Sequence, residues 1–371
     1  MKRSAERILT THTGSLPRPD ELVDLLYADA EGEAVPHLDQ QVRQAVAGSV
    51  RKQVEIGLDV VNDGEMGKVS YSTYVAGRLS GYESHTHVPR RPRADVADFP
   101  GYPEWNAKVQ PGASRVRRFA CTGPVRYIGQ KALQRDIGNL QAALQGAGAA
   151  EAFMTAASPG VIASFQPNQY YASNEEYLWA LAEAMREEYE AIHRAGFLLQ
   201  LDCPDLSGLA TGQKPGDLQL RIEVLNHAVS GIPPDAMRMH LCWGNYEGPH
   251  HLDTPLEEIL PEVLSARPAG ISFEGANPRH EHEWKVFEAV RLPEGKVIIP
   301  GVLDTTTNYV EHPELVAQRL LRYGGLVGRE NVIAGTDCGF GTFAGTPIVY
   351  PAIAYAKLQA LVEGARLASE E

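Results

Sequence analysis

Residues 237–246 read MRMHLCWGNY, and residues 270–279 read GISFEGANPR. Each segment opens with a short, mainly apolar run, Met237–Leu241 and Gly270–Phe273, and continues into a polar or glycine-containing cluster. Short runs of this kind are typical of parallel strands that are covered on both faces. The two segments therefore predict buried parallel strands with chemically useful side chains at their carboxyl ends.

The same pattern recurs along the chain and alternates with helical periodicity. The other predicted strands are Arg7–Thr10, Leu58–Asn62, Val116–Cys121, Phe197–Leu201, Lys296–Pro300 and Asn331–Ala334. The predicted helices include Glu175–Ala195, with Ser173 or Asn174 as N-cap, and Asp217–Val229, Pro255–Ala266, His280–Ala289 and Pro313–Tyr323. Eight strands alternating with helices predict an α/β fold, a (β/α)8 TIM barrel with loop insertions. A ninth candidate strand, Val161–Phe165, is interpreted as an accessory strand or part of an insertion.

The length of 371 residues allows one large barrel or several smaller domains. Because the strand-end clusters number eight, we predict a single catalytic TIM-barrel domain over residues 1–371. Residues 82–115, rich in Pro, His and Arg, are predicted to be a long loop insertion. The basic run Arg90, Arg91 and Arg93 lies within it among prolines, and it is interpreted as solvated.

Charge and cysteine usage exclude several classes of protein. The formal net charge of −13 opposes nucleic acid as a partner. No run of about 18 apolar residues is present, so we expect no membrane span. The four cysteines are far apart and do not show the spacing of a secreted disulfide framework, which favours a cytoplasmic location. The oligomeric state stays open.

Four residues at strand ends form a candidate metal site. His240 and Cys242 are two residues apart, so both can face the barrel mouth from one strand. Glu274 and Cys338 follow other predicted strands and would converge on them. Two thiolates, one imidazole and one carboxylate suit a tetrahedral zinc ion. The spacing alone equally allows two buried cysteines and a hydrogen-bonded histidine.

Several of these segments resemble cobalamin-independent methionine synthase, specifically its C-terminal catalytic barrel. The segments that carry the resemblance are THTGSLPRP, DVVNDGE, CTGPV, LLQLDCPDL, MHLCWGNY, ISFEGANPR, IIPGVLD and GTDCGF. The resemblance runs from about residue 8 to residue 345 and implies that His240, Cys242, Glu274 and Cys338 bind zinc. It also implies that Glu65 and Asp202 bind the amino group of homocysteine and that the Ser15 segment binds its carboxylate. Cys121 is interpreted as a core residue, and Cys203 is left open.

The chain departs from the family where the methyl donor binds. The family's histidine thought to protonate the departing folate nitrogen is replaced by Thr306, which cannot serve as the acid. The residues His12, Trp243, Tyr246, His250 and His251 lie near the barrel mouth, and the candidate replacements for the proton donor are the histidines and Tyr246. The family's pterin-stacking tryptophan is also absent, with Tyr127 as a possible substitute. The additional N-terminal barrel of the full-length enzyme is missing, so the length argues against a complete methionine synthase.

The sequence therefore predicts an enzyme, a zinc-dependent thiol alkyltransferase. Its expected activity resembles that of 5-methyltetrahydropteroyltriglutamate–homocysteine methyltransferase, with S-methyl transfer to homocysteine or a similar small thiol. The expected partners are a small-molecule thiol and an alkyl donor whose identity is open. Two alternatives remain: an epoxide-opening thiol transferase of the epoxyalkane:coenzyme M transferase type, and a non-catalytic zinc-binding barrel.

Overall fold

Parallel strands form the centre of the computed structural model, which describes residues 1–88, 93–109, 115–208 and 217–371. Six strands pair in parallel in the order β2-β5-β6-β7-β8-β9, and β1 pairs in parallel with β10. The strands are β1 Leu9–Thr10, β2 Val60–Val61, β5 Glu151–Ala157, β6 Leu198–Asp202, β7 Met237–His240, β8 Gly270–Phe273, β9 Val297–Pro300 and β10 Ile333–Ala334.

Two seams close these strands into a barrel. Between β9 and β10, single parallel bridges join Ile298 to Val332 and Gly301 to Gly335. Between β1 and β2, the Asp59 amide donates to the Thr10 carbonyl at 3.1 Å, and the Thr11 hydroxyl donates to the Val60 carbonyl at 3.0 Å. The predicted (β/α)8 TIM barrel is therefore confirmed.

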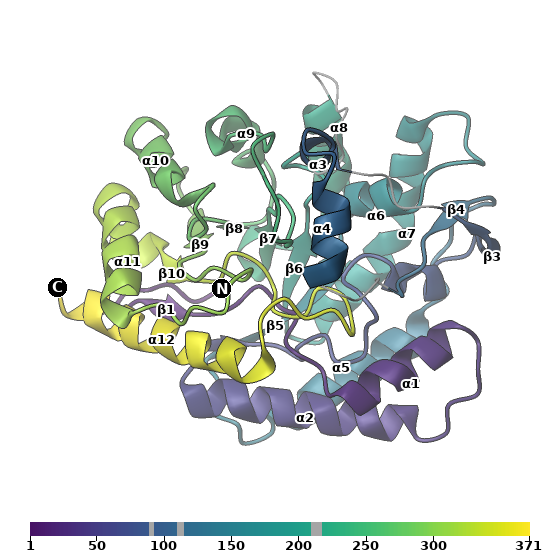
Figure 1. Ribbon diagram of the computed structural model, residues 1–371, viewed down its shortest axis with the longest axis horizontal. Helices are drawn as coiled ribbons and strands as arrows, with labels where there is room; N and C mark the ends of the chain where they lie inside the picture. Colours follow the sequence, from purple (N-terminus) through teal and green to yellow (C-terminus); the bar gives the residue numbers. More distant parts are fainter. Residues whose placement is uncertain (89–92, 110–114, 209–216) are drawn as a thin grey trace.

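Amphipathic helices surround the strands (Figure 1). The outer helices are α1 Asp20–Ala30, α2 Leu38–Ile56, α5 Gln130–Leu144, α6 Pro159–Phe165, α7 Asn174–Arg194, α8 Asp217–Ala228, α9 Leu256–Val263, α10 Val286–Ala289, α11 Pro313–Val327 and α12 Pro351–Glu370. Short 3-10 turns are η1 Tyr74–Gly77, η2 Pro234–Ala236, η3 Glu281–Lys285 and η4 Arg329–Asn331. The N-cap of α7 is Ser173, whose hydroxyl accepts the Glu176 amide at 3.0 Å. Among the described helices, none is long and apolar enough to cross a membrane.

One predicted barrel strand is wrong. Residues of the predicted strand Val116–Cys121 form β4 (Phe119–Cys121), which pairs antiparallel with β3 (Tyr82–His87) outside the barrel. The third barrel strand is instead β5, which pairs in parallel with β2 and β6. The accessory strand considered at Val161–Phe165 is part of helix α6, whose N-cap Ser158 accepts the Val161 amide at 3.0 Å.

The predicted loop insertion is partly ordered secondary structure. Besides β3, it contains α3 (Ala94–Ala97) and α4 (Tyr102–Val109), so the prediction of a long loop over 82–115 is wrong for these segments. Arg93 is half-buried rather than solvated, because it packs on the segment after β7. Arg90 and Arg91 lie outside the described residues. The assignment of residues 1–371 to a single domain stays a prediction.

A buried ionic network joins α7 to the segment after β2. The Glu188 carboxylate on α7 accepts the Tyr74 hydroxyl at 2.6 Å and the Tyr127 hydroxyl at 2.7 Å, and pairs with Arg78 at 3.1 Å. Arg78 also pairs with Asp136 on α5. Burial acts to raise the pKa of Glu188, but the Arg78 charge and the hydroxyl donors lower it overall.

Neutralising Glu188 is expected to destabilise the fold. Glu188→Gln leaves the Arg78 guanidinium with a weaker buried partner, which should lower the free energy of unfolding by about 3 kcal/mol. Glu187→Gln is the matched control, since Glu187 is the exposed neighbour on the same helix; it should change stability by less than about 0.5 kcal/mol. Chemical denaturation measures both variants, and equal effects would show that the network contributes nothing specific.

The same network predicts the sign of a pH effect. Because the folded-state pKa of Glu188 is lowered, its contribution to stability is present above the unfolded carboxyl pKa and is lost as the pH falls. Wild type should therefore lose more stability than Glu188→Gln as the pH drops below about 4.5. Denaturation curves at a series of pH values test this, and parallel losses in both proteins would contradict it.

Candidate metal centre and substrate cavity

A cavity of about 570 Å³ opens at the carboxyl ends of the barrel strands. Residues at the carboxyl ends of six barrel strands, β1, β2, β5, β6, β7 and β10, line it, which is where barrel enzymes carry their chemistry. The lining residues predicted from the sequence are Ser15, Glu65, Asp202, His240, Cys242, Trp243, Tyr246 and Cys338. Most of the sequence-predicted site residues therefore meet in one cavity.

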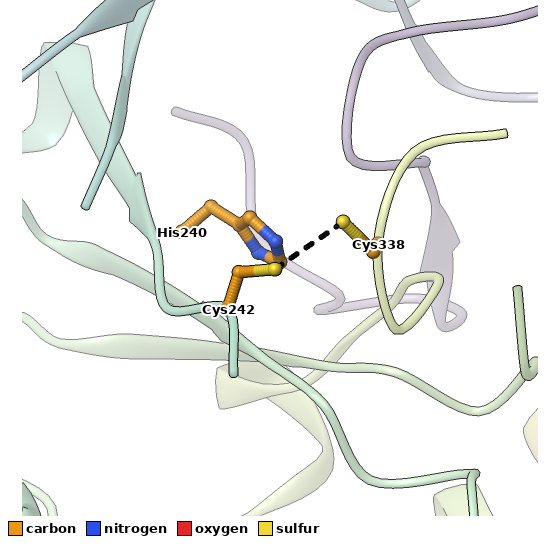
Figure 2. Close-up of side chains that lie close together, drawn as sticks. All are labelled: His240, Cys242 and Cys338. Carbon is orange, nitrogen blue, oxygen red and sulfur yellow. Dashed lines mark hydrogen bonds between the residues drawn. The ribbon is translucent and has the colours of Figure 1, made fainter. Parts of the chain in front are cut away.

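Three of the predicted metal ligands form a buried cluster. The ligand atoms of His240, Cys242 and Cys338 all lie within 4.8 Å of one another. Figure 2 shows the two sulfur atoms facing each other beside the imidazole, with Cys338 coming from a different segment; the sulfurs are 3.5 Å apart. His240 ends β7 and Cys242 follows two residues later, so the spacing argument from the sequence places both side chains correctly.

The environment of the cluster suits a soft cation. The His240 Nδ1 atom contacts the Ser272 hydroxyl at 3.1 Å, while its Nε2 atom is buried and has no hydrogen-bond partner within the described residues. The hydrogen bond between the sulfurs lowers the pKa of Cys242 well below its ordinary value and raises that of Cys338. An unpaired imidazole nitrogen beside two thiols is the donor set that a thiophilic metal ion requires.

Glu274, the fourth predicted ligand, lies beside the cluster but is not part of it. One carboxylate oxygen accepts the Trp243 amide at 2.8 Å, and the other accepts the Asn277 side-chain amide at 2.9 Å. Burial, followed by the Cys242 charge, raises the pKa of Glu274 well above its ordinary value. Its carboxylate is thus tied to the residue next to Cys242, and its role as a ligand stays a prediction.

Asp337 holds the turns that carry Glu274 and Cys338 together. One of its carboxylate oxygens accepts the backbone amides of Gly275 and Ala276, each at 2.8 Å. Asp337 directly precedes Cys338, and Gly275 directly follows Glu274. The two loops therefore form one rigid wall behind the cluster.

Glu65 and Asp202 place two carboxylates in the same cavity. Glu65 has a left-handed backbone, with a φ of 56°, a strained conformation that often marks functional sites. Its Oε1 atom accepts the Thr155 hydroxyl at 2.9 Å. Its Oε2 atom is buried 3.9 Å from the Arg18 guanidinium and forms no hydrogen bond in the part of the chain that the structure describes. Burial and the Glu65 charge raise the pKa of Asp202 well above its usual range. This pair favours a bound cation.

Ser15 is buried at the edge of the same cavity. Its carbonyl accepts the Phe340 amide at 2.8 Å, which joins the segment after β1 to the segment that carries Cys338. The structure thus brings the predicted substrate residues Ser15, Glu65 and Asp202 into the cavity that also contains the cysteines.

Several residues considered for donor binding or proton transfer have their polar atoms engaged with other protein groups. Thr306 donates its hydroxyl to Asp304 at 2.8 Å, and Tyr127 belongs to the Glu188 network, so Tyr127 does not replace the pterin-stacking tryptophan. His12 is fully buried against Gln53, and burial lowers its pKa to about 4. His12 is therefore a neutral packing residue.

The remaining proton-donor candidates already have partners. His250 contacts Asp253 at 2.6 Å, and His251 contacts Asp98 at 2.9 Å. The Trp243 indole donates to the Thr254 carbonyl at 2.7 Å. The Tyr246 hydroxyl donates to Asp95. Trp243 and Tyr246 line the cavity, but their donor atoms point to protein groups.

The other two cysteines are packed in the core. Cys121 is fully buried, and its thiol donates to the Gly123 carbonyl at 3.3 Å. Cys203, whose role the sequence left open, is also fully buried and lies 3.5 Å from the Leu201 carbonyl. Neither belongs to the three-residue cluster.

Tyr71 and Arg93 are among the lining residues that the sequence did not predict for the site. Tyr71 lies six residues after Glu65, and its backbone amide donates to the Thr342 carbonyl at 3.4 Å. Arg93 comes from the insertion. Local sequence carries no signal for either, because both reach the cavity through contacts with distant segments.

Comparison with known proteins supports the resemblance. No protein-family model matches the chain. A methionine synthase of Thermococcus kodakarensis is 22% identical over 372 residues, covering 98% of this chain and 94% of that protein. A methionine synthase of Saccharolobus solfataricus is 24% identical over 366 residues, covering 98% and 95%. A B12-independent methionine synthase of Shewanella sp. W3-18-1, solved with selenomethionine, has the same fold with a TM-score of 0.75 at 20% identity, covering 98% of each chain.

These relatives also correct the inference from length. The chain spans more than nine-tenths of the curated relatives, 94% and 95% of their lengths. Its single-barrel length therefore does not separate it from proteins named methionine synthase. Over nearly its whole length the chain is therefore similar to proteins named methionine synthase, and it shares the fold of a B12-independent methionine synthase.

Proposed function

We propose that this chain is a zinc-dependent enzyme that transfers a methyl group to the sulfur of homocysteine. The observation that carries the proposal is the buried His240, Cys242 and Cys338 cluster in one cavity with Glu65 and Asp202. Such a cavity offers a place for a sulfur atom and, beside it, for a cationic amino group. The curated relatives named methionine synthase support the choice of homocysteine and methyl transfer.

His240, Cys242 and Cys338 would hold the zinc ion, with Glu274 as the proposed fourth ligand. Two sulfurs and an imidazole are donors that Zn²⁺ prefers over Mg²⁺ or Ca²⁺. The buried Nε2 atom of His240, which has no described partner, supports this assignment. When bound, zinc would keep the substrate thiol deprotonated and nucleophilic at neutral pH.

The protein's own residues would orient the amino acid. Glu65 and Asp202 would flank the ammonium group. The Oε2 atom of Glu65 has a 3.9 Å ion pair with Arg18 and forms no hydrogen bond within the described residues, and two carboxylates in one cavity attract a cation. Ser15 would bind the carboxylate. These contacts would fix the sulfur beside the cysteines and would exclude water from that end of the cavity.

The alkyl donor is the open part of the proposal. The Thr306 hydroxyl donates its hydrogen bond to Asp304, so it does not supply a proton to a leaving group. A panel of donors that includes methyltetrahydrofolate and epoxides separates methyl transfer from the epoxide-opening alternative. The names of the curated relatives favour methyl transfer.

Substitution of the cluster cysteines is expected to remove zinc. Wild type should bind about one zinc ion per chain, whereas Cys242→Ser and Cys338→Ser should each lose most of it, because serine is a poor zinc ligand at neutral pH. Elemental analysis after dialysis measures the content. Cys121→Ser is the control, because Cys121 lies outside the cluster. The introduced serine hydroxyl can donate to the Gly123 carbonyl as the thiol does. Full zinc retention by both cluster variants would rule out this metal site.

Removal of either carboxylate is expected to weaken amino-acid binding. Glu65→Gln and Asp202→Asn should each raise the KM for homocysteine by about tenfold or more, because a charge-assisted contact to the ammonium is lost. The control is a ligand: 3-mercaptopropionate has no ammonium group, so its affinity should fall in neither variant. Equal losses for both thiols would mean that the carboxylates do not recognise the amino group.

A further inference from the structure

Arg93 packs against the segment that follows the metal cluster. Its guanidinium lies over the Tyr246 ring, with the Arg93 Cζ atom 3.7 Å from the ring centroid, and donates to the Trp243 carbonyl at 3.3 Å. Gly244 lies directly beneath it: a Cβ atom at this residue would collide with the guanidinium, and its φ of 122° is one that other residues rarely adopt. The arginine is thus fixed against Trp243 and Gly244, the two residues that directly follow Cys242 in the chain.

This guanidinium has unused binding capacity. An arginine side chain carries five N–H donors, and one hydrogen bond is recorded for Arg93, to Trp243. No carboxylate of residues 1–88, 93–109, 115–208 or 217–371 forms a salt bridge with it. The side chain also lines the cavity, so a ligand there could provide the missing partner.

The Tyr71 hydroxyl is a second unpaired donor in the same cavity. The Tyr71 ring is held edge-on between Phe165 and Phe343, with ring centroids 5.8 Å away in each case. No described group forms a hydrogen bond with its hydroxyl. Burial raises the pKa of Tyr71 well above 10, the charges of Cys242 and Cys338 raise it further, and Arg93 opposes them. The phenol of Tyr71 therefore stays protonated in the wall of the cavity.

The other cations of the cavity wall are already engaged. Arg221 pairs with Asp205 at 3.2 Å. Arg118 lies 4.3 Å over the Phe165 ring and has a further partner. Glu65 and Asp202 make their part of the wall acidic. An anion entering the cavity would therefore find its best electrostatic partner at Arg93.

We propose that Arg93 and the Tyr71 hydroxyl bind an anionic oxygen group, such as a carboxylate or a phosphate, of a substrate seated over the Cys242–Cys338 pair. The proposal rests on the proposed thiol chemistry for the identity of that substrate. The anionic group has two candidate sources. One is the alkyl donor, and the other is the carboxylate of the acceptor thiol, which Arg93 and Tyr71 would then bind in place of Ser15. Arg93 would supply a charge-assisted fork of donors, and Tyr71 would supply one further hydrogen bond.

Titration calorimetry on the zinc-supplied protein tests this in two arms. The first compares 3-mercaptopropionate with 3-mercapto-1-propanol, which have the same length and differ in charge. The second titrates glutarate and inorganic phosphate, with and without saturating 3-mercapto-1-propanol. The variants are Arg93→Met and Tyr71→Phe. The control is Arg115→Met, whose exposed arginine comes from the same insertion and pairs with Asp24 at 2.8 Å.

Wild type should bind the anionic probe of at least one arm about tenfold more tightly than the variants do. The variants should keep the wild-type affinity for 3-mercapto-1-propanol and the wild-type melting temperature, and the control should behave as wild type. Loss confined to the first arm assigns the site to the acceptor tail, and loss in the second arm with thiol present assigns it to the donor.

Anion affinities that are unchanged in both variants would overturn the proposal. Failure of the thiol chemistry would look different. If neither thiol binds even with zinc supplied, the proposed function is wrong, while the thiol-free titrations still measure whether Arg93 and Tyr71 recognise an anion. The two proposals can therefore fail separately.

Discussion

The structure depends on holding two thiols and an imidazole together in a buried position. Cys242 and Cys338 are 96 residues apart in the chain, yet their sulfurs lie 3.5 Å from each other. Thiols and an unpaired imidazole nitrogen make a poor hydrophobic core, because buried polar atoms without partners cost free energy. The loops that carry them must therefore be fixed by other contacts, and the barrel supplies those contacts.

Asn245 shows how this is done. Its side-chain amide donates to the Gly339 carbonyl at 2.8 Å, and its oxygen accepts the Thr305 hydroxyl at 2.9 Å. Three loops, those following β7, β9 and β10, are thus tied by one residue. Asp337 adds the loop after β8, because its carboxylate accepts three backbone amides there, those of Gly275, Ala276 and Asn277. The cluster is consequently rigid before any ligand arrives, which is the condition for precise positioning of a sulfur atom.

The strands that bear the cluster were predicted from the sequence. A short apolar run indicates a buried strand, and the polar cluster after it marks where the strand ends. Strand β5 was not predicted, because Glu151 and Thr155 interrupt its apolar pattern. Residues Val116–Cys121 were wrongly placed in the barrel, because a strand-like pattern does not reveal which sheet the strand joins. The two-residue spacing of His240 and Cys242 is a local property, so the sequence correctly predicted that their side chains lie close together. The hydrogen bonds that hold Glu274 are tertiary contacts, so no pattern in the sequence could have revealed them.

The position of the insertion, residues 82–115, likewise depends on tertiary contacts that the local sequence does not reveal. Its proline-rich composition suggested solvent, but it docks on the loop that follows Cys242: Asp95 accepts the Tyr246 hydroxyl, Asp98 contacts His251, and Tyr102 donates to the Glu247 carbonyl. These contacts join the insertion to the outer wall of the cavity and leave the cysteines untouched. His240, Cys242 and Cys338 lie in the barrel's own strand-end segments, whereas the insertion supplies Arg93 and the outer wall beside them. Under the proposed function, a change in the insertion would therefore alter the recognition of the second substrate more than that of the thiol.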